Sequence, residues 1–496
     1  MGWDHVSTAG AHEHEGGLTH TERAALDESS RLAVLACFIS AMAWLILGSL
    51  FGDIASLKFN FPDWLAASGW LTFGRVRMVH LNTMIYGWAS LTMIGVAAWL
   101  TPRLLHTPLQ VRNLVLTGVG LWNVGLLFGN GLILVGWNNG LEWLEMDRWL
   151  SAPWIVLGGG CIALSLFITM ARRRVKHLYV SVWYALGAFL WFPLIYVTGM
   201  LPIYTGVEHA AVNWFYAHNA LGFWLSAISL AAIYYFIPKV LGRPIYSYQL
   251  SLIGFWSLAF FYSLNGMHHL IGGPLPSWMI TTSIVASLMM VIPVLAVAVN
   301  HHMTVIGRFS ALRYSPTLRF IVLGAMAYTA VSLQGIFTAL VKVNRLTHFT
   351  QWTIAHSHTG VYAFVTLTLF GSMYYILPRL TKREWPSDSL IRWHFWLALG
   401  GITLYVVALS IGGVLQGLAM NDTSQPFEAS VTVTLPFLWL RSLAGLILTA
   451  AHFVFAYHIA WMLGALPQVR LLPPWHQPVP IIVPPAGEGP ATGAGS

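Results

Sequence analysis

Residues 350–377 read TQWTIAHSHTGVYAFVTLTLFGSMYYIL, without one Asp, Glu, Lys or Arg. A helix needs about 20 consecutive apolar residues to cross the core of a lipid bilayer. Backbone groups in lipid have no water to bond, so a segment of this kind is expected to be a helix. The same run contains His356 and His358, which places two imidazole groups at membrane depth.

The rest of the chain repeats this apolar pattern. Its 496 residues are 57% hydrophobic and only 8% charged, whereas a soluble domain carries about 25% charged residues. About twelve runs are long enough to span a bilayer: 32–52, 78–101, 113–136, 150–171, 178–200, 211–237, 249–271, 278–300, 317–341, 350–377, 391–418 and 434–463. We therefore predict an all-α, polytopic membrane bundle of about twelve transmembrane helices over residues 31–465.

Two polar segments flank the predicted bundle. Residues 1–30 lack the pattern of a signal peptide and are expected to form a polar N-terminal tail, in which we interpret residues 12–15 (His-Glu-His-Glu) as solvated. Residues 466–496 are rich in Pro and Gly and are expected to form a second tail. With alternating helices, 18 of the 25 Lys and Arg residues lie on the side of the termini. The positive-inside rule therefore predicts that both tails are cytoplasmic.

Cysteine usage and charge exclude several classes of protein. Cys37 and Cys161 lie in apolar runs, and the sequence has no C-x-x-C pair. A disulfide framework, a thiolate metal site and a covalently attached c-type haem are therefore excluded. The net charge of +8 is spread over short loops, so we expect no nucleic-acid partner.

Six histidines fall at one depth of the predicted bundle. At about 1.5 Å per residue along a helix, all lie within about 15 Å of the outer surface. They are His80, His218, His268, His269, His356 and His358. Ionisable side chains inside a membrane are costly and indicate function. Because imidazole is the commonest metal ligand, we expect these side chains to converge on bound metals.

The spacing of the histidines predicts how the metals are divided. His356 and His358 are about 200° apart around a helix, so they face different partners. Each can therefore hold its own planar haem. An iron bound by one imidazole keeps an open coordination site, whereas two opposed imidazoles fill both axial sites. His268, His269 and His218 form a three-imidazole set suited to copper with an open position. The sequence therefore predicts two haems and one copper.

Several motifs between about residues 70 and 375 resemble the catalytic subunit of C-family (cbb-type) haem–copper cytochrome c oxidases. They are FGRVRMVH (73–80), WFYAHNA (214–220), YFIPK (235–239), GRPIYSY (242–248), GMHHL (266–270) and TIAHSH (353–358). The resemblance implies that His80 and His358 bind a low-spin haem b and that His356 binds the high-spin haem. It further implies that His218, His268 and His269 bind copper.

The resemblance also implies an activity and a setting. A bacterial inner-membrane enzyme of this kind reduces dioxygen to water with electrons from membrane-anchored c-type cytochrome subunits, coupled to proton uptake. Tyr262 matches the family's active-site tyrosine, which is joined to a copper-binding histidine. It precedes His269 by seven residues, so we expect both on one face of a helix. Tyr248 and Ser251 resemble the start of the family's proton path to Tyr262.

Two further resemblances depend on charged residues near the outer surface. Arg75, Arg77 and Arg441 could pair with haem propionates, although cations at an interface also snorkel without a partner. Glu142 and Glu145 resemble a calcium-associated acidic segment of the family, although two carboxylates also suit a solvated loop.

Two positions depart from the family pattern. Gln334 stands where the family has a glutamate, and an amide keeps the hydrogen-bonding shape but cannot ionise. Proton pumping and redox tuning are therefore expected to differ. His301 and His302 form an unfamiliar pair near the inner surface, which we interpret as interfacial.

Two other functions fit part of the pattern. A nitric oxide reductase of the same superfamily would carry extra glutamates near the second metal, yet Gly222 occupies the matching place and the eighth span has no acidic residue. A membrane cytochrome b that only relays electrons would need no copper set.

Overall fold

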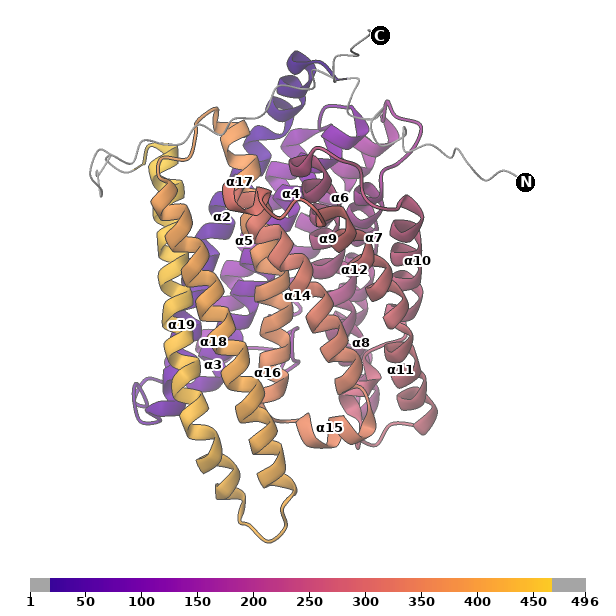
Figure 1. The fold of residues 1–496 in the computed structure, drawn as a ribbon. Coiled ribbons are helices and arrows are strands. Elements are labelled where there is room, and N and C mark those ends of the chain that lie inside the picture. The colour runs from indigo at the N-terminus through magenta and orange to yellow at the C-terminus, as the bar shows by residue number, and fades with distance from the viewer. Residues whose placement is uncertain (1–17, 466–496) are drawn as a thin grey trace, which may run out of the picture.

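The computed structural model describes residues 18–465, and within them twelve helical spans are long and apolar enough to cross a membrane. This confirms the predicted helical membrane bundle. The spans run side by side (Figure 1), and α2 begins at the end of the bundle where α19 finishes. We call this end the terminus end and the other the opposite end. The spans are His20–Asn60, Phe73–Leu105, Arg112–Val135, Ala152–Ala171, Val180–Met200, Gly206–Leu241, Tyr248–Leu270, Ser277–Val305, Pro316–Thr338, Gln351–Thr381, Asp388–Asn421 and Phe427–Leu463.

The first helix starts earlier than its apolar run. Helix α2 begins at His20 because Thr19 and Glu22 form a capping box, in which each side chain bonds the backbone of the other residue. Asp27 then pairs with Arg103 at 2.8 Å, which fastens the polar turns to the bundle. The expected polar tail is thus helical from His20 onward. The predictions for residues 12–15 and 466–496 concern segments outside the described residues.

Three central spans contain the most buried segments of the bundle, and each includes a π-helical segment. The three spans are α3–η2–α4 (Phe73–Asn82, Thr83–Ala89, Ser90–Leu105), α8–η3–α9 (Gly206–Ala220, Leu221–Ser226, Ala227–Leu241) and α16–η5–α17 (Gln351–His358, Thr359–Thr366, Leu367–Thr381). The π segments begin one to three residues after His80, His218 and His358. Wide π turns are rare and occur mostly at functional sites. The histidines therefore sit where the helix geometry changes.

The seventh span is interrupted before its histidines. Helix α10 (Tyr248–Ser263) ends before Gly266, whose φ of 116° is accessible mainly to glycine. A Cβ at Gly266 would also lie 2.7 Å from the carbonyl oxygen of Trp214. His268 and His269 follow on a short 3₁₀ turn, η4 (Met267–Leu270). The expectation that Tyr262 and His269 share one face of a continuous helix is therefore wrong.

The remaining helices surround the central spans. They are α5 (Arg112–Val135), α6 (Ala152–Ala171), α7 (Val180–Met200), α11 (Ser277–Met289), α12 (Val291–Val305), α14 (Pro316–Thr338), α18 (Asp388–Asn421) and α19 (Phe427–Leu463). The short helices η1 (Gly69–Leu71), α13 (Ala311–Tyr314) and α15 (Val341–Thr347) lie in connections. Helices α18 and α19 project past the other spans at the opposite end (Figure 1).

Candidate haem and metal site

One cavity among the central spans is lined by all six histidines that the sequence placed at a common depth. They come from α3, α8, η4 and α16, which are far apart in the sequence. Tyr262, Arg77, Arg441 and Glu142 line the same cavity. The structure thus brings together most of the side chains singled out from the sequence.

The predicted copper ligands form a compact group. His218, His268 and His269 each offer a ring nitrogen, and these atoms all lie within 4.8 Å of one another. No other group of three such ligands occurs in residues 18–465. The ring of Trp214 stacks on His269 with a centroid separation of 4.1 Å. Three neutral imidazoles at this separation suit a transition metal with an open coordination position.

Helix α11 fixes the orientation of His268. The backbone N–H of His268 donates to the Ser283 hydroxyl at 3.0 Å. Its Nδ1 lies 3.2 Å from Ser283 Oγ and 3.0 Å from Ser287 Oγ. Ser287 in turn lies 3.0 Å from the side-chain oxygen of Asn265. Such secondary contacts orient a ligand imidazole and determine which ring nitrogen faces the metal.

The other three histidines also line the cavity, and each bonds an oxygen acceptor through Nδ1. Nδ1 of His80 lies 2.7 Å from the Gly48 carbonyl, and Nδ1 of His358 lies 2.9 Å from the Ile354 carbonyl. Nδ1 of His356 lies 3.2 Å from the amide oxygen of Gln334. A carbonyl oxygen only accepts, so each Nδ1 carries a proton and each Nε2 keeps a free lone pair. These histidines are therefore prepared to bind iron through Nε2.

Tyr262 packs directly against the three-histidine group. Its ring centroid lies 4.5 Å from that of His218. A Cβ at Gly222 would lie 2.2 Å from the Tyr262 ring, so no larger residue fits there without moving the tyrosine. A glutamate at position 222, which a nitric oxide reductase would require, would therefore have to displace the Tyr262 ring.

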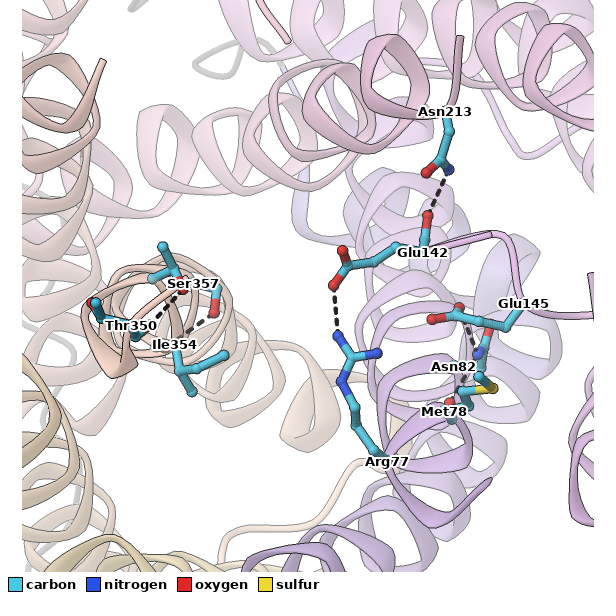
Figure 2. A network of polar contacts seen from close by, with 10 residues as sticks. Arg77, Met78, Asn82, Glu142, Glu145, Asn213, Thr350, Ile354 and Ser357 are labelled. Carbon is cyan, nitrogen blue, oxygen red and sulfur yellow. Dashed lines mark hydrogen bonds and ion pairs between the residues drawn. The ribbon is translucent and has the colours of Figure 1, made fainter. Parts of the chain in front are cut away.

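Figure 2 shows a polar network that includes Arg77 and Glu142, which both line the cavity. Arg77 contacts Glu142 at 2.5 Å, and Asn213 donates to the Glu142 backbone carbonyl at 2.8 Å. Asn82 donates to Glu145 at 3.1 Å. Burial raises the pKa of Glu145 to about 7. The two carboxylates thus have separate partners, and within the described chain they belong to no three-ligand metal group.

The three predicted propionate cations differ in their surroundings. Arg77 and Arg441 line the cavity, and the Arg441 guanidinium lies 4.8 Å from the Phe59 ring centroid. Arg75 instead donates to the backbone carbonyls of Gly69 and Leu134, at 2.6 and 3.0 Å. Its guanidinium therefore links the connection that contains Gly69 to helix α5. Arg75 does not line the cavity.

The two polar residues at the start of α10 are bonded to backbone. The Tyr248 hydroxyl donates to the Leu178 carbonyl at 2.8 Å, and the Ser251 hydroxyl donates to the Tyr248 carbonyl at 2.5 Å. Three further tyrosines, which the sequence analysis did not single out, are buried in helices α7, α9 and α14. They are Tyr184, Tyr234 and Tyr328. Their signal was present, since each places a hydroxyl inside an apolar span.

Comparison with known proteins decides the family. Residues 32–447 match the family described as Cytochrome C and Quinol oxidase polypeptide I. The chain belongs to this family. It is 33% identical over 438 residues to the Cbb3-type cytochrome c oxidase subunit CcoN1 of Stutzerimonas stutzeri, covering 85% of this chain and 92% of the relative. It is 32% identical over 445 residues to the cytochrome c oxidase subunit 1 homolog of Azorhizobium caulinodans, covering 84% and 79%.

A solved structure supports the fold. The protein of "Cryo-EM structure of a heme-copper terminal oxidase dimer provides insights into its catalytic mechanism" aligns with a TM-score of 0.68 at 17% identity, covering 91% of this chain and 86% of that chain. This oxidase polypeptide I is therefore a bacterial membrane oxidoreductase of the haem–copper class. Reduction of dioxygen is the chemistry of its family, which uses haem and copper.

Proposed function

We propose that this subunit reduces dioxygen to water between a high-spin haem on His356 and a copper on His218, His268 and His269. A second, low-spin haem between His80 and His358 would deliver the electrons. One observation carries the proposal: the three-histidine group shares a cavity with three histidines whose Nε2 atoms are free. The sequence has no C-x-x-C-H motif for covalent attachment, and the likeness to a Cbb3-type oxidase subunit supports the proposal that both haems are b-type.

The donor sets suit these groups. His80 and His358 would together hold one haem iron, and His356 would hold the other iron alone and leave it able to take a further ligand. When bound, the haem and copper would supply electrons for the reduction of dioxygen. The chain itself orients the ligands through Gly48, Ile354, Gln334, Ser283 and Ser287. The Tyr262 ring occupies the space that a side chain at Gly222 would fill, and it packs against His218. Its phenol is therefore placed to give a proton and an electron beside the copper ligands.

The arginines that line the cavity suggest where the haem carboxylates would lie. Arg77 and Arg441 line the cavity at the end that holds the histidines, so we assign the propionates to them. Arg75 is left out of this assignment because backbone carbonyls occupy its guanidinium. Binding of calcium by Glu142 and Glu145 stays a prediction, and their separate partners give it no additional support.

We further propose the direction of electron and proton supply. The excess of Lys and Arg at the terminus end supports a cytoplasmic location for that end. Electrons then arrive at the opposite end from membrane-anchored c-type cytochrome subunits, since this chain carries no copper-binding Cys pair of its own. Protons would enter from the cytoplasm past Tyr248 and Ser251 on α10 and reach Tyr262.

Consumption of dioxygen tests the proposal. The purified, haem- and copper-loaded protein with its partner subunits is supplied with a reduced c-type cytochrome, and dioxygen is followed with an electrode. We expect cyanide-sensitive consumption with about four electrons used per dioxygen, as complete reduction to water requires. A membrane cytochrome that only relays electrons would consume no dioxygen under these conditions.

A further inference from the structure

Four histidines are buried in the described bundle outside the proposed metal ligands. They are His301, His394, His452 and His458. The interpretation of His301 as interfacial is wrong, because its imidazole is buried against the Tyr234 ring, with the ring centroids 4.3 Å apart. Of the four, only His452 lines the cavity that contains the proposed metal ligands. The surroundings of His452 therefore bear on the chemistry of that cavity.

His452 links three spans through its two ring nitrogens. The Ser49 hydroxyl on α2 donates to the Leu45 carbonyl at 2.7 Å, so its oxygen accepts from Nδ1 of His452 at 2.7 Å. Nε2 of His452 then accepts from the Tyr362 hydroxyl on η5 at 2.9 Å. Ser49 and Tyr362 also line the cavity. The neutral imidazole is therefore hydrogen-bonded on both sides at the cavity wall.

Polar side chains continue from His452 along the contact between α2 and α19. Their spacing of three or four residues puts each set on one face of its helix. The Thr449 hydroxyl donates to Asp53 Oδ2 at 2.7 Å. Ser442 donates to the side-chain oxygen of Asn60 at 2.7 Å, so the Ser56 hydroxyl donates to Ser442 at 2.9 Å. We name this set the polar seam: Ser49, Asp53, Ser56, Asn60, Ser442, Thr449 and His452.

Asp53 is the one carboxylate within the described spans that lines the cavity. Its Oδ1 occupies space beside Gly445, where a Cβ would lie 3.0 Å from that oxygen, so the carboxylate faces α19. The preceding residue, Gly52, faces His80 instead. Among residues 18–465, no Lys or Arg forms an ion pair with Asp53. Ionisable side chains at membrane depth are costly, and they mark proton relays in pumps and transporters.

The polar seam leads from the cavity to the opposite end of the bundle. Five of its members line the cavity, whereas Ser442 and Asn60 do not. Asn60 is the last residue of α2. Its side-chain nitrogen is buried and makes no hydrogen bond within the described part of the chain. Since buried polar atoms are nearly always bonded to protein or to ordered water, we expect water beside Asn60.

We propose that Asp53 carries protons from the cavity to the opposite side of the membrane along the polar seam. The ionised carboxylate accepts a proton from water in the cavity and becomes a neutral carboxylic acid. It then releases that proton toward Ser56, one helical turn away, and returns to the carboxylate form. The hydroxyls of Ser56 and Ser442 each accept one proton and donate another, which passes the charge to water at the end of α2.

The low-spin haem proposed above gives this transfer its direction. An electron held between His80 and His358 adds negative charge to the cavity that Asp53 lines, which favours proton binding by the carboxylate. Departure of the electron removes this attraction and favours release. The inference therefore rests on the proposed function, because electron transfer through the cavity drives the proton transfer.

Proton release from vesicles measures the transfer. The protein with its haems, copper and partner subunits is reconstituted into vesicles with valinomycin and K⁺, and reduced c-type cytochrome is added outside. A pH-sensitive dye then reports the protons released outside per electron. Asp53→Asn keeps an acceptor for Thr449 but cannot ionise, so we expect it to lower this number at least about twofold while dioxygen consumption continues. Asp53→Glu restores a carboxylate and should recover part of the release.

A matched control and a second readout separate proton transfer from packing. Asp422→Asn makes the same change on an exposed residue at the same end, outside the polar seam, and should leave proton release unchanged. In Asp53→Asn both haem spectra should be retained, and the reduction potential of the low-spin haem should rise, because an added electron no longer meets a negative charge nearby. A purely structural role would not move that potential in this direction while the spectra stay the same.

Equal proton release per electron in Asp53→Asn and in the unmodified protein would overturn the inference. If Asp53→Asn does not assemble, Ser442→Val takes its place, since it puts an apolar side chain on the outward step. Unchanged release in Ser442→Val would then overturn the inference. Failure of the unmodified protein to consume dioxygen would contradict only the proposed function. Normal consumption without any outward release of protons would contradict only the inference.

Discussion

Replacing Gln334 by leucine should raise the reduction potential of the high-spin haem. The Gln334 oxygen accepts from Nδ1 of His356 at 3.2 Å. This bond increases electron donation by the imidazole and so favours ferric iron over ferrous iron. Leucine has similar size but no acceptor, so the ferric state loses that support. Gln334 thus acts through His356 as a positioning residue.

The length of the hydrogen bond limits the size of the effect. A distance of 3.2 Å is at the long end of the N–H···O range, so a net contribution of about 0.5–1 kcal/mol is reasonable. For a one-electron couple, about 1.4 kcal/mol corresponds to about 59 mV. If most of the bond's contribution is specific to the ferric state, Gln334→Leu should raise the potential by about 20–40 mV.

A spectroscopic redox titration measures this change with an internal control. The low-spin haem, whose proposed ligands His80 and His358 bond backbone carbonyls, should keep its potential. An unchanged high-spin potential, or equal shifts in both haems, would refute the reasoning. Gln334→Glu keeps the acceptor and can ionise, so we expect it to lower the potential and to raise the number of protons pumped per electron in vesicles. An unchanged proton count would show that the departure from the family has no effect on pumping.

Three further predictions concern the copper side of the cavity. His268→Ala should abolish dioxygen reduction while the low-spin haem spectrum survives; joint loss of both haems would contradict the assigned ligands. Tyr262→Phe should bind both haems and turn over at least about tenfold more slowly, whereas normal turnover would remove its redox role. Gly222→Val should displace the Tyr262 ring, because a Cβ there meets it at 2.2 Å. Loss of turnover with retained haems would agree with this, and full activity would show that the tyrosine moves freely.

The sequence predicted the spans and the level of the histidines well. Both follow from properties that need no tertiary contact, since an apolar run dictates a helix in lipid and a known rise per residue gives depth. His80, His218 and His356 line one cavity, as their common depth implied. The helical start at His20 was missed because its first turns are polar and are held by Thr19, Glu22 and Arg103.

Features that depend on neighbouring helices could not be predicted in this way. The break at Gly266 fits against the Trp214 carbonyl, which is about 50 residues away in sequence. Arg75 looked like a partner for an anion, yet Gly69 and Leu134 carbonyls bind it once the chain is folded. The sequence carries only a weak signal for the π segments. One such signal is Ser90, whose hydroxyl donates to the carbonyl five residues earlier in the structure. Serine and threonine hydroxyls also bond backbone carbonyls in ordinary α-helices, so this signal alone does not predict a π segment.

Metal analysis of the purified protein, combined with a reduced spectrum before and after carbon monoxide, tests whether six imidazoles hold two haems and one copper. We expect two irons and one copper per chain, with carbon monoxide altering one haem and leaving the other unchanged. Iron without copper, or two haems that both ignore or both bind carbon monoxide, would contradict it.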